Sequence, residues 1–301
     1  MRPGDALLAA GLRQALDRFE AARERLPGVA GAAERSTLIE QLVESQRRRV
    51  YVQRLSGMEL DPRRADPASA SLFDPLKGAV VMRRGGAVDE AFWMAFLFVH
   101  FGKSRRGGWA YARDVYGRLG AGRWDWASVA RDPAVFRAWM EAEADRIHDQ
   151  GVGGFGNHRK YQKLASTGLT VETYVGWVGG SHVDRFEGLA AACRGDPRAT
   201  FAAAYRAMGP VAGFGRTARF DYLTTVGRLG LFAVEPDRAH LDGATGPLAG
   251  ARLLFGSASP ALELDDRLVA LGAELALTMD VVEDAVCNWQ KSPAAFTPFR
   301  G

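Results

Sequence analysis

The chain has 301 residues, of which 47% are hydrophobic and 25% are charged. Such a chain can bury a sizeable core, as one large domain or two lobes, and its charge content argues against wholesale disorder. The formal net charge of +4 is compatible with a polyanionic partner but is too small to identify one. Only five of the 39 basic residues are lysines, a bias that a GC-rich genome explains as well as phosphate recognition does.

The two cysteines, Cys193 and Cys287, form no CxxC motif, which predicts a reducing compartment without zinc or iron–sulfur ligation. No carboxylate or cysteine stands at ligand spacing from the glycine-flanked histidines, so we expect no metal and no cofactor. Charged residues interrupt the apolar run at the N-terminus, and no apolar stretch is long enough to span a membrane. We therefore expect a cytoplasmic protein, with no membrane association and no obligate protein partner.

Helical periodicity dominates the first 130 residues. Apolar residues between Leu7 and Phe19 recur at three- and four-residue steps, and a second helix is expected to open near Thr37, with arginines 47–49 near its end. Residues 57–88 are rich in Gly, Pro, Asp and Ser and predict a long connection. The strand signal is thin, and residues 78–82 carry most of it.

Aspartates mark several predicted helix starts. Asp89 is expected to cap an apolar helix that runs through Phe101 and ends at Gly102. Asp132-Pro133 and Asp196-Pro197 each predict an N-cap followed by proline at the first helical position.

The last third of the chain predicts a helix over 218–229 and a helical turn over 236–241. A glycine-rich bend follows over 241–247, and then a helix over 248–255. An apolar stripe from Leu264 to Trp289 predicts one more helix of about two dozen residues. Together these elements predict an all-α fold.

The bend carries the first candidate site. Gly243 and Gly246 permit a tight turn whose backbone N–H groups, with Thr245 between them, face the start of a helix. Such donors and the helix dipole bind phosphate independently of base sequence. Glycine-rich turns between helices are also common without any ligand, so the alternative is an ordinary connection.

The order of parts resembles the helix-hairpin-helix DNA glycosylase superfamily. In that superfamily a helix is followed by a glycine bend, a second helix and then a catalytic acid. The residues at the corresponding positions here are Leu241, Gly243, Gly246, Ala251 and Asp265. Thr245 is an inserted residue relative to that pattern. Pro247-Leu248 stands where bifunctional members carry a lysine nucleophile. The resemblance implies two helical lobes around a DNA-binding cleft and a monofunctional, Asp-assisted glycosylase.

An aspartate suits that chemistry because breaking an N-glycosidic bond builds positive charge on the sugar, which a carboxylate stabilises. Asp265 and Asp266 are the first candidates for this role. The alternative is that one of them only caps a long helix. Asp221 lies in an otherwise apolar helix start, and we interpret it first as a buried hydrogen-bonded group and second as a catalytic candidate.

A second constellation lies at residues 153–163, where cations and aromatics alternate without an acid. This pattern is typical of a segment that stacks a flipped base and grips phosphate, although a solvated basic loop has the same composition. The candidate base-pocket residues are Phe155, Asn157, His158, Tyr161 and His182. The further candidates for DNA-phosphate binding are Lys103, Arg159, Lys160 and Arg216.

At the level of whole motifs, the chain resembles the α-glutamyl/putrescinyl thymine pyrophosphorylase-like family, clade three. The motifs that carry the resemblance are Phe101-Gly102-Lys103, Ala112-Arg113-Asp114-Val115-Tyr116-Gly117, Phe155-Gly156-Asn157-His158-Arg159-Lys160-Tyr161, Gly180-Ser181-His182, Phe214-Gly215-Arg216, Phe220-Asp221-Tyr222-Leu223, Ala244-Thr245-Gly246-Pro247 and Glu283-Asp284-Ala285-Val286-Cys287-Asn288-Trp289-Gln290-Lys291. They leave an N-terminal helical segment, residues 1–75, outside a glycosylase-like domain of residues 76–301.

The resemblance implies action on double-stranded DNA that carries modified bases. The first expectation is a glycosylase that excises a hypermodified pyrimidine, in defence against phage, and leaves an abasic site. The alternative is a transferase that displaces pyrophosphate from an activated 5-hydroxymethyl pyrimidine. A non-catalytic DNA-binding module is the third, because fold analogy is a weak warrant for function. The sequence leaves open which base is modified and which aspartate acts.

Overall fold

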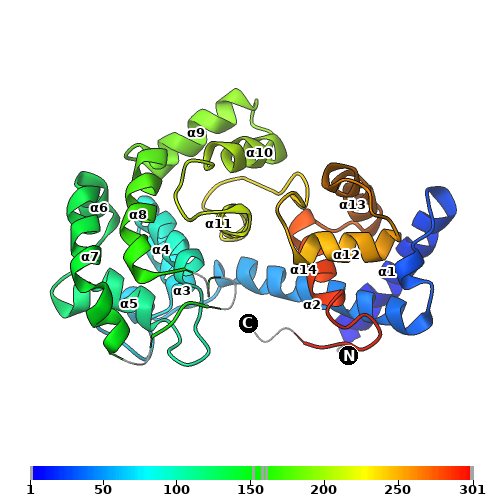
Figure 1. Ribbon diagram of the computed structural model, residues 1–301, viewed down its shortest axis with the longest axis horizontal. Coiled ribbons are helices and arrows are strands. Elements are labelled where there is room, and N and C mark those ends of the chain that lie inside the picture. The colour runs from blue at the N-terminus through cyan, green and yellow to red at the C-terminus, as the bar shows by residue number, and fades with distance from the viewer. Residues whose placement is uncertain (1–2, 151–152, 157–158, 160–161, 299–301) are drawn as a thin grey trace. The chain divides into compact units, whose positions relative to one another are not determined.

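The computed structural model describes residues 3–150, 153–156, 159 and 162–298. In these residues every regular element is a helix, and β-type pairing is limited to one isolated antiparallel bridge between Ser104 and Gly108 (Figure 1). The all-α expectation is confirmed. No helix in this part of the chain combines the length and the apolar character needed to cross a bilayer.

The chain forms two compact units. The first combines Met1–Val52 with Pro236–Arg300, and the second is made of Gln53–Glu235. Residues 1–75, which the sequence sets apart, therefore contribute to both units. Helix α2 (Ala32–Leu55) runs from one unit into the other.

The first unit joins helices from the two ends of the chain. They are α1 (Pro3–Ala22), η1 (Pro27–Val29), the larger part of α2, α12 (Gly246–Phe255), α13 (Ala261–Leu275) and α14 (Met279–Trp289). Its core is mostly aliphatic and contains leucines from α1, α2 and α13 together with the fully buried Trp289. These side chains follow the periodic stripes that the sequence shows.

Glycines set how closely helices approach in this unit. A Cβ atom on Gly250 of α12 would lie 2.3 Å from the carbonyl oxygen of Val286 in α14, and one on Gly28 would lie 2.3 Å from that of Leu253. Backbone atoms cannot move aside as a flexible side chain can, so both positions require glycine.

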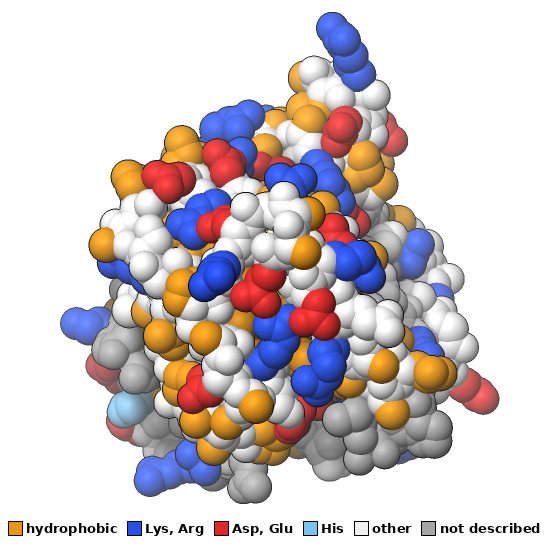
Figure 2. Space-filling model, turned by 90° about the vertical axis from the view of Figure 1, so that its right-hand side faces the viewer, with side chains coloured by type: hydrophobic (Ala, Val, Ile, Leu, Met, Phe, Trp, Pro, Cys, Tyr) orange, Lys and Arg blue, Asp and Glu red, His pale blue; other side chains and the backbone are white. Residues whose placement is uncertain are grey.

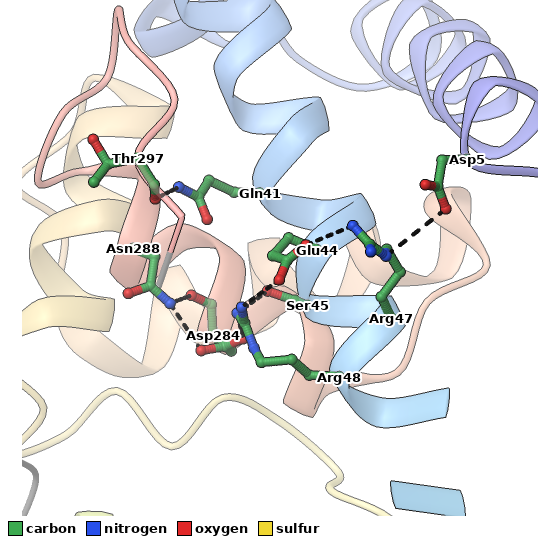
Figure 3. Close-up of polar contacts among 9 residues, drawn as sticks. All are labelled: Asp5, Gln41, Glu44, Ser45, Arg47, Arg48, Asp284, Asn288 and Thr297. Atoms are coloured by element: carbon green, nitrogen blue, oxygen red, sulfur yellow. Dashed lines mark hydrogen bonds and ion pairs between the residues drawn. The ribbon is translucent and has the colours of Figure 1, made fainter. Parts of the chain in front are cut away.

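The arginines near the end of the first-unit part of α2 are paired with acids rather than left for a ligand (Figure 3). Arg47 donates to Glu44 at 2.9 Å, and Arg48 bonds Asp284 of α14. Arg49 lies 3.4 Å from Asp280, a buried carboxylate of the same helix. The pairs of Arg48 and Arg49 fasten α14 to α2, so the basic run has a structural role.

The second unit is built around α4. Its helices are α3 (Pro75–Arg84), α4 (Val88–Phe101), α5 (Ala110–Tyr116), α6 (Trp126–Arg131), α7 (Pro133–Asp149), α8 (Leu164–Val178), α9 (His182–Ala192), α10 (Pro197–Ala207) and α11 (Arg216–Arg228), with the short helices η2 (Pro62–Ala65) and η3 (Arg118–Gly120). Residues Ala91–Leu97 of α4 are at most 1% exposed, because neighbouring helices cover the helix on all sides. Its all-round apolar sequence predicts this burial.

The connection expected over 57–88 is wrong in part, and so is the strand at 78–82, because α3 lies there. The carboxylate of Asp74 accepts from the backbone N–H of Lys77 at 3.1 Å, and Pro75 occupies the first turn. A Cβ atom on Gly78 would lie 2.3 Å from the Met94 side chain of α4. Packing against α4 therefore favours a helix over the local strand propensity.

Three other expectations about helices are corrected. The second helix begins at Ala32 rather than near Thr37. Residues 236–241 form no helix. The apolar stripe from Leu264 to Trp289 is divided between α13 and α14, because Ala276 adopts a left-handed conformation with φ of 51°. The aspartate–proline pairs do cap α7 and α10, as predicted.

Candidate functional site

The glycine bend in the first unit is a hydrogen-bonded turn. The backbone N–H of Ala244 donates to the carbonyl of Leu241 at 2.9 Å, and Gly243 has φ of 71°, in the left-handed region. Asp242, Gly243 and Thr245 are exposed, whereas Leu241 and Ala244 are buried. The turn thus shows its polar edge to solvent and keeps its apolar side chains in the core.

Helix α12 begins directly after this turn. Thr245 is its N-cap residue, and the Thr245 side chain makes no capping bond to the first N–H groups of the helix. A Cβ atom on Gly246 would lie 2.7 Å from Sγ of Cys287 in α14. Close packing therefore requires glycine at position 246. The contact joins the motif 244–247, which forms the bend, to the motif 283–291 in α14.

Asp265 and Asp266 have different surroundings although they are consecutive. Asp265 is 3% exposed, and its Oδ2 accepts from the backbone N–H of Leu241 at 2.9 Å. The Asp266 side chain is 68% exposed and lies 3.6 Å from Arg238. Neither is the N-cap, which is Pro260, so the capping alternative is wrong.

The contact of Asp265 joins two parts of the candidate site. Leu241, the first residue of the turn, is hydrogen-bonded to Asp265. The backbone N–H groups of the turn and the Asp265 carboxylate are therefore held together within the first unit. A buried carboxylate creates a strong local field, because little water screens it. Such an arrangement can bind a phosphate at the turn and stabilise positive charge nearby.

The second unit contains a separate polar centre at Arg159. This side chain is 7% exposed; its Nε–H donates to the carbonyl of Val99 at 2.9 Å, and its NH2 lies 3.4 Å from Oδ2 of Asp221. Burial lowers the pKa of Arg159, and the nearby Asp221 carboxylate partly opposes that shift. Asp221 itself is 40% exposed, so the pair reaches the surface through its carboxylate.

Aromatic side chains pack beside this centre. Phe155 stacks on Phe101 with ring centroids 5.6 Å apart, and the backbone N–H of Gly156 donates to Phe101 O at 2.8 Å. His100 is buried and bonds the Thr167 hydroxyl at 3.0 Å. Burial, and then the charge of Arg159, lowers the pKa of His100 to about 3, so its imidazole is neutral at neutral pH.

His182 is fully buried, and both of its ring nitrogens have partners within the protein. Nδ1 lies 2.8 Å from Asp89, and Nε2 lies 2.7 Å from the hydroxyl of Tyr174. That hydroxyl is 2.7 Å from the hydroxyl of Tyr222. His182, which was predicted to line the base pocket, is therefore committed to the interior.

The other predicted site residues have varied positions. Lys103 is exposed at the end of α4, and the guanidinium of Arg216 lies 4.7 Å from the ring centroid of Phe220. The structure brings Arg159 and Asp221 together, as it does Asp265 with the turn. The remaining candidates, Asn157, His158, Lys160 and Tyr161, lie outside the described residues.

Sequence reasoning missed Asp89, Tyr174 and Tyr222 as one network. Asp89 was expected to cap α4, but the N-cap is Ala87, and the Asp89 carboxylate bonds His182 instead. The only available signal in the sequence was the carboxylate of Asp89 at the start of a largely apolar helix. Helix capping explains a carboxylate at that position without a distant partner such as His182.

Charges are mixed on the surface that Figure 2 shows, where basic and acidic side chains alternate with apolar ones. A broad basic face is therefore not a feature of this view, in line with the small net charge. Among the described residues no group of three or more His, Cys, Asp or Glu side chains is placed to hold a metal ion.

The fold and the site define an all-α protein in which a glycine turn is fixed to a buried carboxylate. The chain belongs to the family described as alpha-glutamyl/putrescinyl thymine pyrophosphorylase clade 3, whose model matches residues 33–301. Membership confirms the resemblance that its motifs indicate and implies an enzyme related to the modification of DNA bases. No curated protein and no solved structure matches the chain.

Proposed function

We propose that the protein is a DNA glycosylase that excises a modified pyrimidine base and leaves an abasic site. The observation that supports this best is the 2.9 Å bond between the Asp265 carboxylate and the backbone N–H of Leu241. In a nucleotide the sugar is bonded to the phosphate. An acid held next to a phosphate-binding turn therefore suits a reaction at the sugar.

In the proposed reaction the bond between C1′ of the deoxyribose and the base nitrogen breaks, and its electron pair leaves with the base. Water adds to C1′ and loses a proton, and the departing base gains one. The Asp265 carboxylate stabilises the positive charge that develops on the sugar. It acts as a buried electrostatic stabiliser rather than as a base, since only 3% of the residue is exposed.

A single-step hydrolysis agrees with the residues after the turn. Pro247 is buried and Leu248 partly buried, and neither can form a Schiff base with C1′. In the second unit, Arg159 and Asp221 offer a donor next to an acceptor, which is what the edge of a pyrimidine base requires. We propose that this pair binds a base of the DNA.

Mass spectrometry of nucleobases tests the proposal. Purified protein is incubated with phage DNA that contains hypermodified pyrimidines and with unmodified DNA of the same length. We expect free modified base and alkali-labile sites only with the modified DNA. If neither product forms with any hypermodified DNA, the proposal fails.

A transferase is the second candidate, and the family's name favours it, because a pyrophosphorylase acts on a pyrophosphate bond. Such an enzyme would displace pyrophosphate from an activated 5-hydroxymethyl pyrimidine in DNA. The same mass spectra distinguish the two activities: the base would stay in the DNA with a new adduct, and pyrophosphate would appear in solution. A protein that only binds DNA would give neither result.

A further inference from the structure

A buried chain of hydrogen bonds crosses the second unit from α4 to α11. Asp89 lies in the first turn of α4, His182 at the start of α9, Tyr174 in α8 and Tyr222 in α11. The three contacts measure 2.8, 2.7 and 2.7 Å in that order. His182, Tyr174 and Tyr222 have no exposed surface, whereas the Asp89 side chain is 34% exposed.

The direction of each bond follows from the chemistry of the groups. A carboxylate only accepts, so Nδ1 of His182 carries the proton that bonds Asp89. Burial lowers the pKa of His182, although Asp89 opposes the shift, so the imidazole is neutral and Nε2 accepts from the Tyr174 hydroxyl. The Tyr174 oxygen then accepts from the Tyr222 hydroxyl. Each bond in the chain thus depends on the one before it.

The Arg159–Asp221 pair lies at the same two helices. Arg159 is fixed to the far end of α4, because its Nε–H donates to Val99 O. Asp221 stands next to Tyr222 in α11. The separation of 3.4 Å between NH2 of Arg159 and Asp221 lies near the limit for a hydrogen bond, so a shift of α11 by a few tenths of an ångström breaks it.

We propose that His182, Tyr174 and Tyr222 are positioning residues, which set α11 against α4 so that Asp221 meets Arg159. This assignment rests on the proposed function only in that the pair is taken to recognise the base. His182 therefore acts through α11 and does not touch the substrate. The aromatic packing of Phe96 on Tyr174, with centroids 4.1 Å apart, holds the middle of the chain in place.

Two changes at position 182 separate the two arms of the network. His182→Asn keeps an N–H near Nδ1, and hence the bond to Asp89, but removes the acceptor for Tyr174. His182→Gln keeps an amide oxygen near Nε2 for Tyr174 and loses the Asp89 arm. Tyr222→Phe removes the last hydroxyl and leaves the ring packing intact. Tyr116→Phe is the matched control, because its buried hydroxyl donates to Glu90 at 2.7 Å outside the network.

The first readout is the ¹⁵N–¹H resonance of Arg159 Nε in the full-length protein, assigned from its loss in Arg159→Lys. We expect His182→Asn, His182→Gln and Tyr222→Phe to shift this resonance, because each breaks one bond of the network between α4 and α11, while Tyr116→Phe leaves it in place, whatever each does to Tm. In base release, these three variants are expected to lose about tenfold in rate, since misplaced contacts cost rate.

A resonance that does not move in Tyr222→Phe, or that moves equally in Tyr116→Phe, overturns the proposal. The resonance is measured without a substrate. If it shifts as expected while no variant releases a base, the positioning role stands and the proposed function fails.

Discussion

The carboxylate of Asp265 and the backbone nitrogen of Leu241 are 2.9 Å apart although 24 residues separate them in the chain. The bond fixes the first residue of the glycine turn to α13, and α13 packs against α1, α12 and α14. The conformation of the turn is therefore set by the core of the first unit as well as by its own glycines.

Asp265→Asn is expected to abolish most base release without loosening the turn. The amide oxygen of asparagine can still accept from Leu241, while the negative charge is removed. We expect the rate to fall roughly 10²- to 10³-fold, as when one electrostatic stabiliser is lost, with Tm nearly unchanged. Single-turnover assays on modified DNA measure the rate. Asp266→Asn is the control, because its carboxylate is largely exposed, and an equal loss in that variant would contradict the assignment.

Gly250→Ala is expected to destabilise the first unit, because the added Cβ would lie 2.3 Å from the carbonyl oxygen of Val286. Forcing α12 away from α14 costs about 1–3 kcal/mol. Gly11→Ala is the matched control: its Cβ would meet no atom within 4 Å on α1, and alanine there should add about 0.5–1 kcal/mol. Denaturant unfolding measures both changes, and similar effects of the two variants would refute the packing argument.

The second unit is expected to lose stability as the pH falls below 6.5, the ordinary histidine value. Burial lowers the pKa of His100 to about 3 and also lowers that of His182. Below pH 6.5 the unfolded chain binds protons at these histidines that the folded chain does not, so stability is complete above pH 6.5 and decreases on acidification. His100 alone removes about 2 kcal/mol between roughly pH 6.5 and 5.

The matched variant for the pH experiment is His100→Gln, whose amide can still bond Thr167. Urea unfolding at the two pH values should show a smaller loss in the variant than in the unchanged protein. Glu90 has the opposite sign, because burial raises its pKa and protonation favours the folded state. Only the difference between the two proteins therefore isolates His100, and identical pH dependences would disprove its contribution.

Lys103→Gln is expected to weaken DNA binding at all sequences, because Lys103 is exposed and its charge is available to a phosphate. Loss of one phosphate contact lowers the slope of log K against log salt concentration by about 0.9. Binding titrations at several salt concentrations measure the slope. Lys77→Gln is the control, since the Lys77 ammonium lies 3.9 Å from Asp74; equal slopes for both variants would exclude the contact.

The elements that the sequence predicts well are those with a local cause. The apolar helix over α4, the aspartate–proline caps of α7 and α10 and the stop at Gly102 depend on neighbouring residues alone. The strand expected at 78–82 was wrong because its surroundings are distant: Met94 packs on Gly78 across the α3–α4 contact. An apolar run of five residues fits a strand and a buried helix equally well.

For the candidate site, too, the sequence predicts what depends on local order and misses contacts between distant residues. The glycines of the turn and the pair Asp265 and Asp266 could be chosen from their order in the chain, since the helix-hairpin-helix pattern fixes that order, but the order does not say which aspartate acts. The bond between Asp89 and His182 joins residues 93 positions apart, and no spacing rule connects them. Nor does spacing show that Arg47, Arg48 and Arg49 are matched by acids from other parts of the chain.

The first unit contains residues 1–52 and 236–300, while residues 53–235 form a unit of their own. During synthesis, all residues of the second unit therefore leave the ribosome before the last residues of the first unit are made. Leucines of α1 and α2, such as Leu12, Leu16 and Leu42, stay uncovered until α12, α13 and α14 have been synthesised. The turn and its aspartate are assembled last, so a nascent chain cannot complete the candidate site until α14 has been synthesised.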